Sequence, residues 1–153
     1  VVGFGHAVND LTREPDDLTK MDTLKVAAEK AMKMAGITVN DLSTIELHDC
    51  FTIAGLLALE AIGVVGYGEA PEFVKNGNTA RSGKLPVNTT GGLIGWGHPT
   101  GGTGVHMAVT VWEQLTGRAN ANQVTIHSDK PYALSVNMGG DDRTLVAIVY
   151  KKA

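Results

Sequence analysis

A glycine-rich stretch with a single histidine, Leu85–Gly104 (LPVNTTGGLIGWGHPTGGTG), constrains the fold more than any other part of the sequence. Glycine tolerates positive φ angles and close backbone contacts, while Pro99 fixes its own φ and biases His98 away from helical geometry. A periodic apolar run, Val105–Leu115, follows at once and predicts a helix. We therefore expect a strand that ends before the glycines, a tight irregular turn that carries His98, and a helix directly after that turn.

The glycine pattern does not match the common nucleotide-binding loops. A P-loop ends in Gly-Lys-Ser or Gly-Lys-Thr, and no such tripeptide follows these glycines. The dinucleotide fingerprint G-x-G-x-x-G is matched only at Gly95 and Gly97, with Thr100 where the third glycine belongs. No later acidic residue is a clear ribose ligand. The glycines alone are equally compatible with helix–sheet packing and with a functional turn.

The bulk composition limits the class of protein. At 153 residues the chain has the length of one domain, or of half of a larger one, and 43% apolar residues suffice for a buried core. A net charge of −3 disfavours nucleic acid or an anionic membrane as the main partner. No apolar run reaches the roughly 18 residues of a transmembrane helix, so we expect no membrane span.

The cysteine content and the start of the chain bear on location and completeness. The single cysteine, Cys50, is typical of a reducing compartment, and no signal peptide is visible. We expect a cytoplasmic location, or a peroxisomal one if the source is a eukaryote. Because the sequence starts at Val1 in an apolar run rather than at methionine, we expect a fragment or a processed piece of a longer protein.

Alternating helical and strand patterns predict an α/β fold. Strands are expected at residues 1–8, 43–47, 85–88, 133–138 and 144–150, and helices at residues 23–35, 51–62, 70–75 and 102–116. Asp22 is the expected N-cap of the first helix. The helix at residues 51–62 is apolar almost all round, which predicts burial on most faces. The order βαβαβαββ indicates a mixed, largely parallel sheet with helices on its faces, closed by a hairpin at residues 139–142.

Three turns carry the chemically useful residues: His48–Phe51, Gly97–Pro99 and Asn137–Gly140. Because the carboxyl ends of parallel strands gather along one sheet edge, we expect these turns to share a site. Two alternatives remain open: His48 as a helix cap, and Cys50 as an ordinary small buried residue.

A metal centre is not expected in these turns. His48, Cys50 and His98 lack both a fourth ligand and the short ligand spacing of zinc sites. The other histidines have no partner in sequence and are expected to be structural: His6, His106 and His127.

Two segments, ELHDCF at residues 46–51 and GGLIGWGHPTGGTG at residues 91–104, resemble the C-terminal signatures of the thiolase superfamily. The sterol-carrier-protein type is most similar, because it has His-Asp-Cys-Phe where common thiolases have Asn-Glu-Ala-Phe. The resemblance covers nearly the whole chain and implies the C-terminal half of a thiolase subunit, a mixed five-stranded sheet with helices. It implies an acyltransferase of the acetyl-CoA C-acyltransferase type, which cleaves 3-ketoacyl-CoA with CoA or condenses two acyl-CoA units.

The resemblance also assigns roles to residues. His98 would take the proton from a nucleophilic cysteine, His48 would donate to a thioester or enolate oxygen, and Cys50 would move the proton on and off the acyl α-carbon. The backbone N–H groups of Gly139 and Gly140 would form a second oxyanion hole. The residues expected along the acyl or pantetheine arm are Phe51 and Met138.

Two departures from the common thiolase pattern shape the expectation for this chain. Asn137 stands roughly where common thiolases carry the acid/base cysteine of a Cys-x-Gly turn, so that role would pass to Cys50. The nucleophilic cysteine belongs to an N-terminal half that is absent here, so we expect the isolated chain to be inactive.

The resemblance also implies ligands and partners. We expect no tightly bound cofactor, with coenzyme A as substrate or product and acyl-CoA as the other substrate. The expected protein partners are an N-terminal thiolase half, in the same or a separate chain, and further copies in a homodimer or tetramer.

Two alternative functions stay open. One is a non-catalytic lipid-binding or scaffold protein with this fold, which the presence of His48, Cys50 and His98 together disfavours. The other is a steroid side-chain carbon–carbon lyase that acts with a small zinc-ribbon and OB-fold partner. Such lyases replace catalytic residues of thiolases, whereas histidine and cysteine are retained here.

Overall fold

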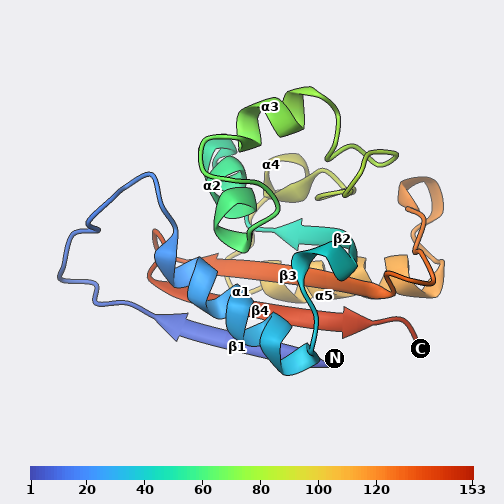
Figure 1. Ribbon diagram of the computed structural model, residues 1–153, viewed down its shortest axis with the longest axis horizontal. Coiled ribbons are helices and arrows are strands. Elements are labelled where there is room, and N and C mark those ends of the chain that lie inside the picture. The colour runs from blue at the N-terminus through green and yellow to red at the C-terminus, as the bar shows by residue number, and fades with distance from the viewer.

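The chain is built on one mixed sheet of four strands (Figure 1). The computed structural model describes residues 1–153, with β1 (Gly3–Val8), β2 (Leu42–Leu47), β3 (Tyr132–Gly139) and β4 (Thr144–Lys151) in the order β1-β4-β3-β2. β4 is antiparallel to both β1 and β3, and only β3 and β2 are parallel. The predicted α/β class is confirmed, but the expectation of a largely parallel sheet is wrong.

The expected fifth strand is reduced to a single bridge. Val87 pairs with Ile45 of β2, and the Ile45 N–H donates to the Pro86 carbonyl at 3.0 Å. Pro86 has no N–H of its own for a ladder, and Asn88 adopts a φ of 48° that ends the extended segment. The sheet therefore has four strands rather than five.

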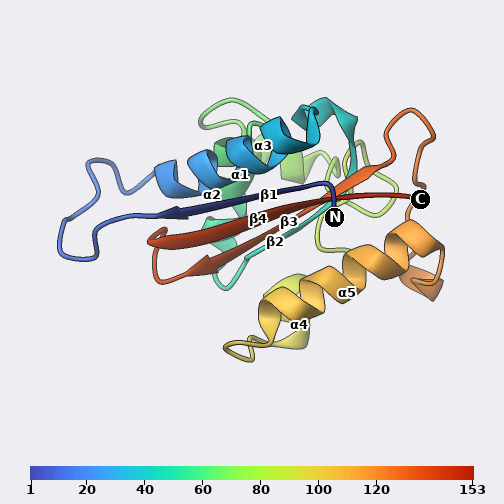
Figure 2. The ribbon, with the colours of Figure 1, turned by 90° about the horizontal axis from the view of Figure 1, so that it is seen from below.

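Helices cover both faces of the sheet (Figure 2). One face carries α1 (Asp22–Ala35), α2 (Thr52–Ile62) and α3 (Ala70–Lys75), and the other carries α4 (Gly92–Trp96) and α5 (Thr103–Thr116). Short 3-10 helices lie at Val39–Asp41 and Asn120–Asn122. α4 lies within the stretch predicted to be an irregular turn, because its two glycines, Gly92 and Gly95, hide a short helical turn in the sequence pattern. No helix is both long and apolar enough to cross a bilayer.

α1 lies unusually close to β1 because both elements present small residues. A Cβ atom on Gly5 would lie 2.0 Å from the Ala27 carbonyl oxygen, and one on Gly3 would lie 2.2 Å from that of Ala31. The buried apolar residues of α1 that complete this layer are Leu24, Ala27, Ala28, Ala31 and Met32. The glycines of β1 thus set the distance between this strand and α1.

α2 is less buried than its apolar sequence predicts. Its inner face, which includes Ala58 and Leu59, packs into the core, but Ile53 is exposed and so is Phe51, which precedes the helix at 71% exposure. Beyond the first two residues of the helix, every residue of α2 is buried or half-buried, so the prediction of burial on most faces fails only at the start of the helix.

The N-terminus of α1 is capped by a residue distant in sequence. Asp22, the expected N-cap, is the first residue of the helix instead, and the carboxylate of Asp142 in the β3–β4 turn accepts N–H bonds from Thr23 and Leu24, both at 2.9 Å. These N–H groups have no partner within the helix, so the carboxylate satisfies both. Burial raises the pKa of Asp142, and the two N–H bonds partly oppose that rise.

We predict that Asp142→Ala lowers the free energy of unfolding by about 1–2 kcal/mol, because two helix-end N–H groups lose their acceptor. Asp141→Ala is the matched control: Asp141 also has a positive φ, 49° against 57° for Asp142, but makes no cap. Urea denaturation of both variants measures the difference. Equal losses would contradict the capping role.

Candidate active site

Two histidines from separate loops meet at one end of the sheet. His48 follows β2, and His98 lies between α4 and α5. Their ring centroids are 4.8 Å apart and the ring planes are perpendicular, so one ring meets the other edge-on. His48 Nδ1 lies 2.8 Å from Asn137 Oδ1 and accepts from the Met138 N–H at 3.4 Å. The three turns named from the sequence therefore contact one another here.

His48 is 4% exposed, and this burial sets its charge. Burial lowers the pKa of His48, the bond to Asn137 partly opposes that shift, and the neighbouring His98 lowers the pKa further. The ring is therefore neutral near pH 7.

The neighbours of His48 allow two placements of the ring proton. The Met138 N–H only donates, but the Asn137 amide can present either its oxygen or its NH₂ group. With the oxygen toward the ring, Nδ1 is protonated and Nε2 accepts. With the NH₂ group toward the ring, Nε2–H is free to donate to a substrate oxygen, as an oxyanion donor requires.

His98 is exposed and is oriented by Thr103, the first residue of α5. Its Nδ1 lies 2.7 Å from Thr103 Oγ1, and the Thr103 hydroxyl donates to the Pro99 carbonyl at 3.3 Å. Since a hydroxyl has one proton, Thr103 accepts from His98 Nδ1–H, and Nε2 keeps its lone pair as a base. Thr103 was not predicted from the sequence, although a hydroxyl residue at a helix start is a recognisable signal.

Cys50 lies in an adjoining cavity rather than in the contact between the histidines. It is a half-buried free thiol that lines a cavity of about 550 Å³ with Phe51 and Met138, and neither His48 nor His98 lines this cavity. Its apolar floor comes from the start of α2 and from Met138, whose Sδ accepts the Asp142 N–H at 3.3 Å. The volume falls within the range of small-molecule sites.

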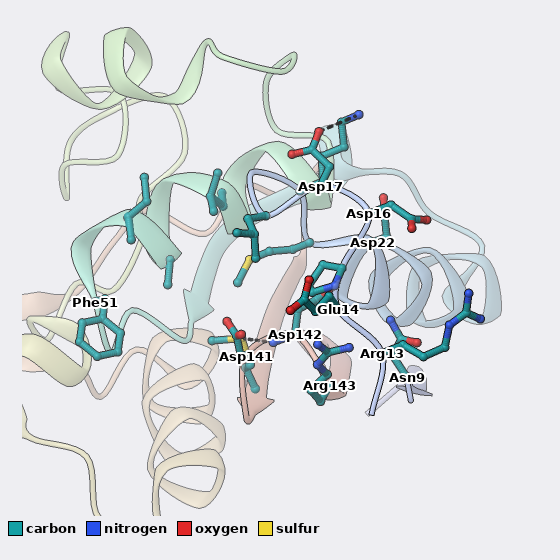
Figure 3. Close-up of a pocket in the computed structure, with 18 of the residues that line it drawn as sticks. Asn9, Arg13, Glu14, Asp16, Asp17, Asp22, Phe51, Asp141, Asp142 and Arg143 are labelled. Carbon is teal, nitrogen blue, oxygen red and sulfur yellow. Dashed lines mark hydrogen bonds and ion pairs between the residues drawn. The ribbon is translucent and has the colours of Figure 1, made fainter. Parts of the chain in front are cut away.

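Charged side chains form the rim of this cavity (Figure 3). They come from the β1–α1 loop, the first residue of α1 and the β3–β4 turn, and acidic groups outnumber basic ones. The acidic residues are Glu14, Asp16, Asp17, Asp22, Asp141 and Asp142, and the basic residues are Arg13, Lys20 and Arg143. Such a rim opposes the approach of a phosphate group.

The remaining residues named from the sequence are also placed. Gly139 ends β3 opposite Thr144, and Gly140 follows with a φ of 57°; both are exposed beside Met138. His106 stacks on Trp96 with ring centroids 3.9 Å apart. His6 and His127 are exposed and lie outside the contact between His48 and His98. No group of three or more His, Cys, Asp or Glu side chains is arranged to hold a metal ion.

A buried acid near the site was missed from the sequence. Glu46 lies two residues before His48 on β2, so both side chains point to the same face of the sheet. It is 1% exposed, and its Oε1 has no hydrogen-bond partner. Burial raises the pKa of Glu46 from 4.5 to about 8, while the Thr89 backbone N–H partly opposes the rise. Glu46 is therefore protonated at neutral pH.

The fold is that of a thiolase-type domain, and the chain belongs to the thiolase C-terminal domain-like family, which its sequence matches over residues 4–152. Acetyl-CoA acetyltransferase of Methanothermobacter thermautotrophicus is 38% identical over 136 residues, which are 89% of this chain and 35% of that protein. Human sterol carrier protein 2 is 42% identical over 103 residues, 67% of this chain and 19% of that protein. The resemblance stated from the sequence is confirmed.

A solved structure has the same fold. The Ltp2-ChsH2(DUF35) aldolase superposes with a TM-score of 0.81 at 22% identity, over 98% of this chain and 38% of that one. The chain thus spans about a third of the length of the acetyltransferase and of this structure.

Glu46 makes stability depend on pH. Between pH 4.5 and about 8 the unfolded chain ionises this carboxyl while the folded chain keeps it protonated, so stability is lost as pH rises. We predict that Glu46→Gln gains stability relative to wild type by up to about 1.4 kcal/mol per pH unit across this window. Denaturation curves at several pH values measure the difference, with the exposed Glu29→Gln as control. A difference that does not change with pH would contradict burial of a neutral acid.

Proposed function

We propose that this chain is the C-terminal catalytic half of a thiolase-like acyl-CoA acyltransferase, which cleaves 3-ketoacyl-CoA with CoA or performs the reverse Claisen condensation. The contact of His48 and His98 at 4.8 Å, with Nε2 of His98 free, carries the proposal. Membership of the thiolase C-terminal domain-like family and the likeness to an acetyl-CoA acetyltransferase support it.

His98 acts as the base in this reaction. A free cysteine at neutral pH is mostly protonated, so an acyl-cysteine route needs a neighbour that takes the thiol proton. The Nε2 lone pair of His98 has this role, because Nδ1 is held by Thr103. The nucleophilic cysteine is supplied by the N-terminal half.

Oxyanion stabilisation comes from two sides. His48 donates through Nε2–H when Asn137 turns its NH₂ group toward Nδ1, and the backbone N–H groups of Gly139 and Gly140 stabilise a second oxyanion. Burial of His48 excludes water and keeps the ring neutral, which strengthens a directed hydrogen bond.

Cys50 and the adjoining cavity serve the acyl group. Cys50 moves the proton on and off the α-carbon, while Phe51 and Met138 provide apolar contact along the acyl or pantetheine arm. The acidic rim keeps the phosphates of coenzyme A away, so the nucleotide binds elsewhere. Coenzyme A is a substrate or product, and no cofactor is tightly bound.

An uncovered apolar surface supports the N-terminal half as partner. Val105, Val109 and Trp112 recur along one exposed side of α5. Phe4 of β1 and Val146 of β4 are exposed on the same side of the sheet, because their strand neighbours face α1. An apolar surface of this kind marks an interface, and we assign it to the N-terminal half. The complete subunits then assemble into a homodimer or tetramer.

A second candidate is a carbon–carbon lyase of the steroid side-chain type, acting with a small zinc-ribbon and OB-fold partner. Its support is the fold likeness to the structure described as the Ltp2-ChsH2(DUF35) aldolase. A nucleophilic cysteine in the N-terminal half favours the thiolase, and its absence favours the lyase.

We predict that the 153-residue chain alone has no thiolase activity and that activity appears when a separately expressed N-terminal half is added. The chain holds a base and oxyanion donors but no nucleophile that they activate. Loss of acetoacetyl-CoA enolate absorbance measures thiolysis. In the mixture, His98→Ala should abolish turnover, whereas the control His106→Ala should retain it. Turnover by the isolated chain near the rate of the mixture would contradict the proposal and make Cys50 the nucleophile.

A further inference from the structure

Two side chains outside the histidine contact tie together the loops that carry His48 and His98. They are Asp49, which follows His48, and Asn88, which lies near the start of the glycine-rich stretch, before its first glycine. Asp49 bonds to the backbone at the start of α4, Asn88 bonds to the backbone of Leu47 at the end of β2, and neither bonds to an imidazole. We refer to this pair as the Asp49–Asn88 clamp.

Asp49 fixes the start of α4. Its Oδ1 accepts the Leu93 N–H at 2.7 Å, and Leu93 is the second residue of that helix. An N–H in the first helical turn has no acceptor within the helix, so this carboxylate supplies it. Only one helical turn and Gly97, at a φ of 96°, separate the bond from His98. The direction of α4 therefore determines where the imidazole lies.

Asn88 holds the other side of the junction. Its Oδ1 accepts the Leu47 N–H at 2.7 Å, and its Nδ2 donates to the Leu47 carbonyl at 3.0 Å. The Asn88 side chain thus makes the two hydrogen bonds to Leu47 that the backbone of a neighbouring strand would make. It does so at the point where the chain leaves the extended conformation. Its φ of 48° suits asparagine better than most residues.

Gly92 shows how closely the clamp is packed. A Cβ atom at this position would lie 2.1 Å from Asp49 Oδ2 and 2.7 Å from Asn88 Nδ2. No side chain fits between these groups, so the clamp accounts for one glycine of the stretch that helix–sheet packing leaves unexplained.

We propose that Asp49, acting with Asn88, is a positioning residue that holds the His98 imidazole in the tautomer and orientation required of a base. Three hydrogen bonds between side chain and backbone join the two loops, and the ring–ring contact lies just beyond them. The consequence for catalysis rests on the function proposed above. The consequence for the imidazole does not, because the clamp lies wholly within this chain.

The test is the ¹⁵N spectrum of the histidine ring nitrogens in the 153-residue chain. In wild type, the neutral form of His98 should show protonated Nδ1 and unprotonated Nε2. Asp49→Ala should move these signals toward a mixture of tautomers. Asp49→Asn should restore them, because its amide oxygen still accepts the Leu93 N–H. Asn88→Gly, which suits the positive φ but removes the side chain, should act like Asp49→Ala and serves if that variant does not fold.

Asp41→Ala is the matched control, because Asp41 also accepts a backbone N–H, that of Thr38 at 2.7 Å, but just before the opposite end of β2. It should lower stability and leave the His98 signals unchanged. Unchanged His98 signals in Asp49→Ala, or no rescue by Asp49→Asn, would overturn the proposal. In the reconstituted enzyme, Asp49→Ala should lower kcat by roughly 10²-fold with little change in KM. Altered tautomers with unchanged kcat would leave the clamp standing and refute His98 as the base.

Discussion

The parallel pairing of β2 with β3 is the interaction on which the site depends. In its register Leu47 lies opposite Val136, which places His48 beside Asn137 immediately after the ladder. Successive strand residues point to opposite faces, so a slip of one residue would turn His48 toward α1 and away from His98. The antiparallel strands β1 and β4 extend the core on one side, while this single parallel ladder aligns the loops that carry the polar residues.

Burial beneath the glycine-rich stretch then sets the protonation of the groups on this strand. Glu46 is held as a neutral acid and His48 as a neutral base, and desolvation is the largest cause of both shifts. An ionised form of either would be an unpaired buried charge. His98, at the exposed side of the contact, keeps access to solvent and substrate. The arrangement sets a buried neutral imidazole against an exposed one.

Local patterns predicted the main helices, four of the strands and the three turns that meet at the site. They failed where contacts join distant segments. The local capping rule favoured Asp22, but Asp142 caps α1 from 120 residues further along the chain. Glu46 was not predicted to be buried, because the segment around Thr89 that contacts it is distant in sequence and lies beside β2 only after folding. The clamp formed by Asp49 and Asn88 has no periodic signature in the sequence. The need for glycine at position 92 follows only from the folded positions of these two side chains, which leave no room for a Cβ atom.

The central claim is that this chain alone brings His48 and His98 into ring contact. A nuclear Overhauser measurement between the imidazole protons of the isolated 153-residue chain, with histidines assigned by single substitution, tests it directly. We expect a cross-peak between the His48 and His98 rings, and a His48 that titrates below the ordinary histidine range because burial lowers its pKa. Absence of the cross-peak in a folded chain, together with an ordinary titration of His48, would contradict it.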